Sequence, residues 1–333
     1  MKLVSYLKDD DTQLALLVNG YLFDTDNLNP NLPVSMTMFL NYWEDTFPIA
    51  YSINKSLIEG TNRYKAINYE EAELLSPVPS PTSFRDAYAF RDHVATARRN
   101  RNAPMIPEFD QFPVFYFSNH NSITGTGEII CMPDHLQKLD FELEIAIVIC
   151  KPCKNIKAEE ADEYIGGFMI MNDFSARTLQ LDEMKLNLGP AKGKDFATAM
   201  GPWLVTTDEL EEFKIPAKEG HTGNAYNLKM KCSVNGVKVS EGNFADMEWT
   251  FAEIIERCSY GVQLYPGDII GSGTVGTGCF LELNGTGKLN DLDYKEQWLK
   301  EGDEIEMEVE GLGILKNSIA KDESDFSILE LKK

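Results

Sequence analysis

The stretch LDFELEIAIVI, residues 139–149, constrains the fold of this 333-residue chain more than any other segment. From Leu143 onward it predicts a strand that enters a hydrophobic core, yet Glu142 and Glu144 stand two residues apart at its start. Side chains at positions i and i+2 of a strand share one face, so both carboxylates would project side by side. Unpaired like charges at that spacing repel and are costly to bury. The pair therefore indicates either a solvent-facing strand edge or a compensating cation.

Composition and charge exclude several kinds of partner. The chain is 43% hydrophobic and 25% charged, as is usual for a globular protein. It has no apolar run of membrane-spanning length, and its start, MKLVSYLKDDD, lacks the apolar segment of a secretory signal, so we expect a cytoplasmic protein without a membrane partner. The net charge of −22 argues against nucleic acid as a partner.

The arginines are clustered, and two of the cysteines form a short motif. Five of the eight arginines fall close together, at Arg85, Arg91, Arg98, Arg99 and Arg101. This cluster indicates either local anion binding or a helix face with surface ion pairs, which contribute little stability. The CKPC motif at residues 150–153 lacks the second pair of a zinc site, and we interpret its cysteines as ordinary reduced thiols.

The chain divides into two predicted domains. Residues 1–75 predict a small N-terminal α+β domain, with short strands, a tight Asn19–Gly20 turn and a helical stretch over 36–59. Residues 76–82 contain SPVPSP and predict a stiff proline-rich linker, which leaves 83–333 as the larger domain.

The larger domain is predicted to be mostly strand. A helix is expected over 83–100, and short helices over 158–164, 175–182 and 251–258. Strands are expected in NLKMKCSVNGVKVSEG, which turns at Asn235–Gly236, and in YPGDIIGSGT, CFLELNG, DEIEMEVEG and GILKNSIA. This is a β-rich α+β pattern rather than an alternating βαβ one.

The segment GSGTVG, residues 271–276, matches the spacing of a dinucleotide-binding loop. Such a loop must be followed by a helix, and because the next residues read as a strand we reject that interpretation. Two readings remain. Small residues could let backbone amides and Thr274 approach a ligand, or the segment is simply a glycine-rich turn.

Two further acidic residues could join the glutamate pair. Asp173 ends the apolar run in MIMNDFSAR, and Asp86 lies in the arginine-rich segment. Together with Glu142 and Glu144 they offer four carboxylates, which suits Mg²⁺, Mn²⁺ or Ca²⁺. Alternatively, Asp86 forms a capping box with Ser83.

His93 follows Asp86 by seven residues. On one helix these two positions would share a face, ~10 Å apart at ~1.5 Å per residue. His93 could then act as a base across a small substrate from the metal, or it could be a structural histidine.

Taken together, these motifs resemble the fumarylacetoacetate hydrolase family over roughly residues 75–320. The resemblance rests on the order of FRDAYAFRDH, FPVFYF, LDFELEIAI, MNDFSARTLQ, GPAKGKDF, GSGT and FLELNG. It implies a roll of mixed β-sheets, a homodimer formed through this domain, and a small oxo or diketo acid as substrate.

The resemblance also implies roles for individual residues. The metal ligands would be Asp86, Glu142, Glu144 and Asp173. The catalytic groups would be His93, Glu282, Gln180 and Lys194. The substrate would contact Tyr88, Tyr116, Arg177 and Thr274, with Arg99 or Arg101 replacing the arginine that the family pattern expects at Asn102.

The predicted activity is metal-dependent hydrolysis of a carbon–carbon bond in a diketo acid such as fumarylacetoacetate or another acylpyruvate, as in tyrosine and aromatic compound degradation. Asn102, and Phe115 in place of a family glycine, weaken the match to fumarylacetoacetate itself. The alternative is a lyase or isomerase of 2-oxo acids at the same metal site: an oxaloacetate decarboxylase, a dehydratase of 2-keto-3-deoxy sugar acids, a hydratase or an isomerase. A non-catalytic binding protein would be expected to lack some of these residues.

Overall fold

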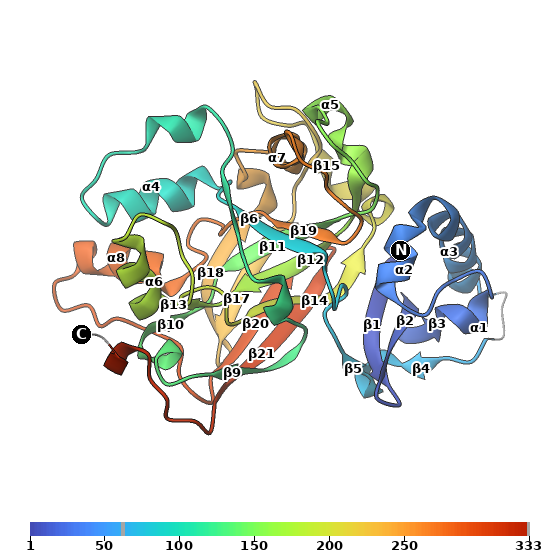
Figure 1. Cartoon of the computed structure of the whole chain (residues 1–333), viewed down its shortest axis with the longest axis horizontal. Coiled ribbons are helices and arrows are strands. Elements are labelled where there is room, and N and C mark those ends of the chain that lie inside the picture. Colours follow the sequence, from blue (N-terminus) through green and yellow to red (C-terminus); the bar gives the residue numbers. More distant parts are fainter. Residues whose placement is uncertain (61–63, 332–333) are drawn as a thin grey trace.

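Two mixed sheets dominate the computed structural model of the chain, which describes residues 1–60 and 64–331 (Figure 1). The larger sheet contains twelve strands: β1 (Lys2–Lys8), β2 (Asp11–Val18), β3 (Tyr21–Asp24), β4 (Ile67–Asn68), β5 (Glu73–Leu74), β6 (Ser83–Ala87), β7 (Phe115–Phe117), β8 (Ile123–Thr124), β11 (Leu143–Ile149), β12 (Ile165–Asp173), β14 (Thr198–Val205) and β19 (Asp268–Gly271). The smaller sheet contains five: β9 (Gly127–Cys131), β17 (Lys229–Val234), β18 (Val237–Asn243), β20 (Glu304–Val309) and β21 (Gly313–Lys321).

Strand pairing is mostly antiparallel. Parallel pairs occur between β6 and β19, between β8 and β14, and between β9 and β21. Two short two-stranded ladders join β10 (Leu139–Asp140) to β13 (Ser175–Ala176) and β15 (Lys214–Ile215) to β16 (Ala225–Tyr226). The β-rich α+β class predicted from the sequence is confirmed.

The helices of the described chain are short and lie outside the sheets (Figure 1). They are α1 (Thr25–Leu28), α2 (Met36–Asn41), α3 (Trp43–Ile58), α4 (Arg91–Arg99), α5 (Ala158–Ala161), α6 (Arg177–Met184), α7 (Phe251–Ser259) and α8 (Phe280–Asn290). Not one of the helices in the described residues combines the length and apolar character needed to cross a membrane.

Strand β11 is buried on both faces, which explains its nearly continuous apolar sequence. Ile145 and Ile147 belong to the core between the two sheets. Ala146 and Val148 point the other way, into a second core. That second core is shared with Leu3 and other residues of β1, β2, α2 and α3.

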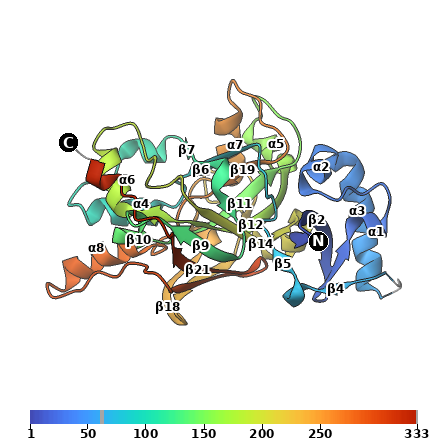
Figure 2. The ribbon, with the colours of Figure 1, turned by 60° about the horizontal axis from the view of Figure 1, so that its bottom comes forward.

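The N-terminal strands continue the large sheet. Strand β1 pairs with β14, and the Met1 ammonium group donates a hydrogen bond of 2.7 Å to Thr206 Oγ1. Figure 2 shows α2 and α3 beside β2, at the end of the molecule that holds the N-terminus. The N-terminal residues thus help to bury the face of the sheet on which the acidic residues described below also lie.

Two of the predicted elements are wrong. The segment 83–100 is not one helix: Ser83 to Ala87 form β6, and the helix α4 begins only at Arg91. Asp86 and His93 therefore do not share a helix face, and there is no capping box at Ser83, whose hydroxyl instead donates to Asp268 Oδ1 at 2.7 Å. The segment CFLELNG is not a strand, because the helix α8 starts at Phe280.

Candidate active site

Three strands of the large sheet change from apolar to acidic on the same face: β12, its neighbour β11, and β6, which is separated from β11 by β19. On β6, Asp86 follows the core residue Phe84 by two positions, and on β12, Asp173 follows the core residue Met171 by two positions. On β11, which runs the opposite way, Glu144 precedes the core residue Ala146. Since side chains two residues apart share a face, the three carboxylates meet where the second core ends.

The three carboxylates converge closely. One oxygen each of Asp86, Glu144 and Asp173 lies within 4.8 Å of the other two, and all three side chains are buried. Gly271 makes this possible: it pairs with Asp86 on one side and with Ala146 on the other, and a Cβ at Gly271 would lie 2.5 Å from Asp86 Oδ1. The Asp86 side chain therefore occupies the space that any larger residue would fill.

The glycine-rich segment after β19 also contacts these carboxylates. The Gly273 N–H donates to Asp86 Oδ1 at 3.2 Å, and the Thr274 hydroxyl donates to Glu144 Oε1 at 3.1 Å. Gly273 has a φ of 79°, which a residue with a side chain rarely adopts. The segment thus approaches the acidic residues through small residues and backbone amides.

Close packing without a cation makes the carboxylates hard to ionise. Burial, followed by the charge of Asp173, raises the pKa of Asp86 to about 8. Burial, followed by the charge of Asp86, raises the pKa of Glu144 well above its usual value. Glu144 Oε2 is buried and has no hydrogen-bond partner among the described residues. An oxygen-only set of this kind fits a hard divalent cation such as Mg²⁺ or Mn²⁺, which would supply the missing charge compensation.

Glu142 has a different environment from the other three acidic residues. Arg177 donates to its Oε1 at 2.7 Å, and Lys194 forms a short ion pair with its Oε2. Burial opposes ionisation of Glu142, but the charges of Lys194 and Arg177 outweigh it and lower its pKa to about 2. Lys194 also contacts Asp173 Oδ2 at 2.5 Å, so its ammonium group links Glu142 to the carboxylate cluster.

The Arg177 side chain is buried and donates hydrogen bonds to three other side chains, so it is not an unpaired cation. Its guanidinium donates to Asp140 Oδ2 at 2.8 Å, to Glu142, and to Gln180 Oε1 at 2.9 Å. The predicted substrate-binding residue Arg177 is thus paired with the predicted catalytic residue Gln180 and with two buried acids. Tyr116 likewise contacts a proposed metal ligand, because its hydroxyl donates to Asp173 Oδ2 at 2.7 Å.

Replacing Arg177 by methionine is expected to lower the free energy of unfolding by about 3–5 kcal/mol, because the two buried carboxylates of Asp140 and Glu142 each lose a charged partner. Denaturant unfolding followed by fluorescence measures this loss. The control is Arg91→Met, since the pair of Arg91 with Asp110 is exposed and should be worth under about 1 kcal/mol. Equal losses in the two variants would contradict the role of Arg177.

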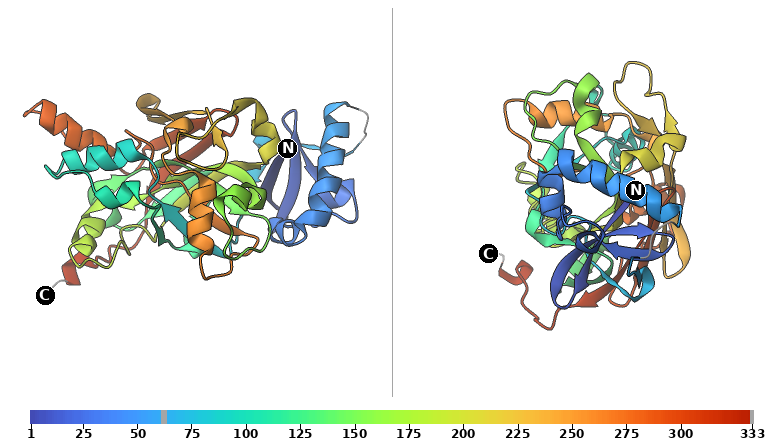
Figure 3. Two further views of the ribbon diagram at one scale, coloured as in Figure 1. Left: turned by 90° about the horizontal axis from the view of Figure 1, so that it is seen from above. Right: turned by 90° about the vertical axis from the view of Figure 1, so that its right-hand side faces the viewer.

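His93 and Glu282 form a buried pair, and His93 lies within electrostatic range of Glu142. His93 Nδ1 lies 2.7 Å from Glu282 Oε2, and Glu282 Oε1 accepts the Thr277 N–H at 2.9 Å. His93 comes from α4 and Glu282 from α8, two helices that lie side by side at one end of the molecule (Figure 3). A hydrogen bond from Nδ1 to Glu282 leaves the Nε2 lone pair of His93 free to accept a proton.

Tyr88 contacts this pair, and Arg99 and Arg101 lie at the last residue of α4 and just beyond it. The Tyr88 ring packs edge-on against the His93 ring, with centroids 5.8 Å apart. Burial raises the pKa of Tyr88 to about 12, and Arg101 partly offsets this rise, so the Arg101 guanidinium is within electrostatic range of the Tyr88 hydroxyl. Arg99 instead donates to Thr286 Oγ1 on α8 at 3.3 Å. Of the two arginines, Arg101 is thus the one that acts on a residue of this site.

Two residues of the site were not singled out from the sequence. Asp140 accepts the backbone N–H groups of Phe280 and Leu281 at 2.7 and 2.9 Å, so it caps the start of α8 and fixes the position of Glu282. Asp140 precedes Glu142 by two residues, and this continuation of the alternating acidic pattern was a usable signal. Cys279 lies within 4.8 Å of both His93 and Glu282. No motif in the sequence pointed to it.

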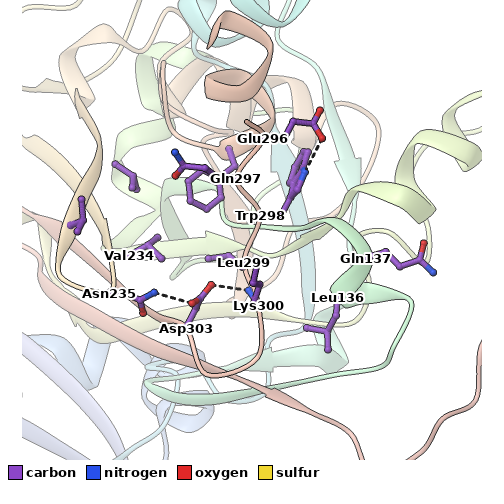
Figure 4. Close-up of a pocket in the computed structure, with 13 residues that line it drawn as sticks. Leu136, Gln137, Val234, Asn235, Glu296, Gln297, Trp298, Leu299, Lys300 and Asp303 are labelled. Carbon is purple, nitrogen blue, oxygen red and sulfur yellow. Dashed lines mark hydrogen bonds between the residues drawn. The ribbon is translucent and has the colours of Figure 1, made fainter. Parts of the chain in front are cut away.

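A cavity of about 500 Å³ lies elsewhere, among β17, β18 and the segment 296–303 (Figure 4). Its walls include Leu136, Val234 and Trp298, and Asp303 closes one side by accepting hydrogen bonds from Asn235 Nδ2 and the Lys300 N–H, both at 2.8 Å. None of the four acidic residues lines it. The converging acids and the His–Glu pair, not this cavity, therefore define the candidate active site.

A family pattern and individual known proteins both match this chain over most of its length. The pattern of the fumarylacetoacetate (FAA) hydrolase C-terminal family matches residues 82–320. A mitochondrial oxaloacetate tautomerase of Homo sapiens is 30% identical over 302 residues, which cover 90% of this chain and 84% of that protein.

Solved structures share the whole fold at low sequence identity. The 2-hydroxyhepta-2,4-diene-1,7-dioate isomerase of Mycobacterium marinum has a TM-score of 0.64 at 21% identity. The maleylpyruvate hydrolase of Sphingobium sp. SYK-6, solved with manganese(II) and pyruvate, has a TM-score of 0.68 at 20% identity. Each alignment covers 97% of this chain and 100% of the other. The family pattern matches most of the chain, and these enzymes share its fold. The chain therefore belongs to the fumarylacetoacetate hydrolase family of enzymes.

Proposed function

We propose that this protein is a divalent-metal-dependent isomerase that interconverts the keto and enol forms of a small 2-oxo dicarboxylic acid, with oxaloacetate as the first substrate to test. The observation that carries the proposal is the buried cluster of Asp86, Glu144 and Asp173 together with the His93–Glu282 pair. The 30% identity to a relative named as an oxaloacetate tautomerase supports the isomerase over the hydrolase that we predicted first.

Keto–enol interconversion moves one proton between a carbon and the carbonyl oxygen on the adjacent carbon. A cation held by Asp86, Glu144 and Asp173 would supply a Lewis acid that favours the enolate over the keto form. His93 would take the proton from C3 at Nε2 and deliver it to the enolate oxygen, and the reverse reaction uses the same steps. Glu282 holds the ring in place and stabilises it while it carries the extra proton.

Basic residues of the site suit a substrate with two carboxylates. Lys194 is buried against Glu142 and Asp173, and their charges outweigh the effect of burial and raise its pKa, so it stays protonated. Arg101 lies near Tyr88 and is exposed, which leaves its guanidinium available for a substrate carboxylate. Because Asn102 stands where the family pattern expects an arginine, we propose Arg101 for this contact.

Hydrolysis of a diketo acid is the second candidate function, and the His93–Glu282 pair is the observation that favours it. A base oriented by a carboxylate can deprotonate water as well as carbon. The manganese-containing maleylpyruvate hydrolase with the same fold gives this candidate a precedent. Mg²⁺ and Mn²⁺ are the proposed cations for either reaction, and a cytoplasmic homodimer remains our prediction from the sequence.

A two-substrate assay separates the candidates. Enzyme with Mg²⁺ is given the enol form of oxaloacetate, whose ultraviolet absorbance falls as the keto form appears, and separately an acylpyruvate, whose cleavage releases pyruvate. The proposal expects metal-dependent acceleration of the first reaction with oxaloacetate conserved. Pyruvate release from the acylpyruvate with no effect on the oxaloacetate enol would instead establish the hydrolase.

A further inference from the structure

A second set of potential metal ligands lies within electrostatic range of Glu142. His93, Cys279 and Glu282 each place one ligand atom within 4.8 Å of the other two, and all three side chains are buried. None of them belongs to the Asp86–Glu144–Asp173 cluster. The protein therefore holds two groups of ligands with different chemistry, one of oxygen atoms only and one of nitrogen, sulfur and oxygen.

We propose that His93, Cys279 and Glu282 form an inhibitory site for a softer divalent cation, for which Zn²⁺ is the matching ion. Zinc binds thiolate, imidazole and carboxylate ligands in tetrahedral sites, and three protein ligands leave one position for water. Mg²⁺ prefers oxygen ligands in octahedral geometry and has little affinity for a thiolate. We therefore expect Zn²⁺ to bind His93, Cys279 and Glu282, and Mg²⁺ to bind the oxygen-only set.

The three ligands are held on rigid elements. Cys279 directly precedes α8 and Glu282 lies in its first turn, where Asp140 fixes the backbone by accepting two N–H groups. His93 lies on α4, which packs against α8 (Figure 3). Only a modest widening of the 2.7 Å contact between His93 and Glu282 is needed to admit an ion.

Binding has a defined proton balance. Burial raises the pKa of the Cys279 thiol well above its usual value, so the free protein holds the thiol protonated. Zn²⁺ would form a bond to sulfur as the thiol proton leaves to solvent, and it would take the Nδ1 lone pair of the neutral imidazole, whose proton moves from Nδ1 to Nε2. Occupation of the site therefore releases a proton and removes both members of the His93–Glu282 pair from proton transfer.

The consequence is a form of inhibition that added Mg²⁺ does not relieve. Asp86, Glu144 and Asp173 can still hold the catalytic cation, but His93 can no longer accept a proton. Zinc binding itself does not depend on the reaction proposed above. The inhibition does depend on it, so binding and activity are measured separately.

The test is isothermal titration of Zn²⁺ into the full-length, Mg²⁺-saturated protein, in buffers of different ionisation enthalpy so that proton release is measured directly. The controls are Cys279→Ala and Cys258→Ala, since Cys258 is also a buried thiol but lies on α7. We expect one Zn²⁺ per chain with proton release in the parent and in Cys258→Ala, and at least ~10-fold weaker binding in Cys279→Ala. Equal zinc affinity in all three proteins would overturn the proposal.

A second variant makes the result independent of how well Cys279→Ala folds. Asp86→Asn disrupts the oxygen-only cluster but leaves His93, Cys279 and Glu282 unchanged. Zinc should bind this variant as it binds the parent. Loss of zinc binding in Asp86→Asn would place the ion among the carboxylates and overturn the proposal.

Discussion

Replacing Glu144 by glutamine is expected to lower metal-dependent turnover by ~10³-fold or more, because a bound cation supplies several kcal/mol of transition-state stabilisation. Glutamine has the shape of glutamate and can keep the hydrogen bond from Thr274. It removes, however, the negative charge that a cation would bind between Asp86 and Asp173. Steady-state turnover at saturating Mg²⁺ and calorimetric Mg²⁺ binding measure the two losses.

The stability of this variant is informative as well. Burial, followed by the charges of Asp86, Glu142 and Asp173, raises the pKa of Glu144, so a negative charge at this position is unfavourable in the metal-free parent. Metal-free Glu144→Gln should therefore unfold at the same or a higher denaturant concentration than the metal-free parent. Glu241→Gln is the matched control, because its ion pair with Lys238 is exposed. Full Mg²⁺ affinity in Glu144→Gln would contradict the assignment of Glu144 as a ligand.

Replacing His93 by alanine is expected to lower kcat by ~10²–10⁴-fold, the usual contribution of a general base. Mg²⁺ affinity should change little, because His93 pairs with Glu282 and not with the clustered carboxylates. Parallel measurements of kcat and of Mg²⁺ binding separate the catalytic effect from loss of the metal site.

The chain offers a close control for this variant. His221 forms a second His–Glu pair, with Nδ1 at 3.1 Å from Glu253 Oε2, on elements that carry none of the proposed site residues. His221→Ala should retain nearly full kcat. If His93→Ala retained full kcat as well, proton transfer through His93 would be ruled out.

The position of the acidic cluster was largely predictable from strand periodicity. Glu144 and Ala146 share a face of β11, and the structure buries that face in the core that includes residues of the N-terminal strands. The two-residue spacing predicted that Glu142 and Glu144 would act together, but Glu142 precedes β11 and is not part of the group formed by Asp86, Glu144 and Asp173. It could not show that Glu142 pairs with Lys194 and Arg177, because both partners lie more than 30 residues away in the sequence.

Strand β6 was predicted as a helix because its buried charged residues hide the alternation of apolar and polar residues that is typical of a strand. Arg85 is almost fully buried: its guanidinium packs over the Phe117 ring at 4.8 Å and lies 3.6 Å from Asp268. A charged residue at such a position looks solvent-exposed in a sequence. With the arginines that follow, it suggested a helix instead of a five-residue strand next to β19.

Helix α8 was misread for a related reason. Its sequence, FLELNGTGKLN, contains two glycines and two asparagines, which are poor helix formers, and its first residues alternate as in a strand. Tertiary contacts stabilise the helix: Asp140 caps its start, and Gly285 packs so closely on Asn100 that a Cβ there would lie 2.5 Å from Asn100 Nδ2. Both partners come from distant parts of the chain.

The reaction was less predictable than the fold. Motifs around the carboxylates and the His93–Glu282 pair specify a cation and a base, and this machinery serves hydrolysis and enolisation alike. Asn102 and Phe115 were the sequence features that weakened the match to fumarylacetoacetate, and the relative named as an oxaloacetate tautomerase favours the isomerase alternative.

Deuterium exchange at C3 of oxaloacetate tests the central claim most directly. Nuclear magnetic resonance follows the exchange in deuterated buffer with Mg²⁺ or EDTA, and a sample with Mg²⁺ but no protein corrects for spontaneous enolisation. The proposed mechanism predicts protein-dependent exchange that requires Mg²⁺, is lost in Glu144→Gln and falls by ~10²-fold or more in His93→Ala. Exchange no faster than in the protein-free sample, or exchange unaffected by EDTA, would contradict it.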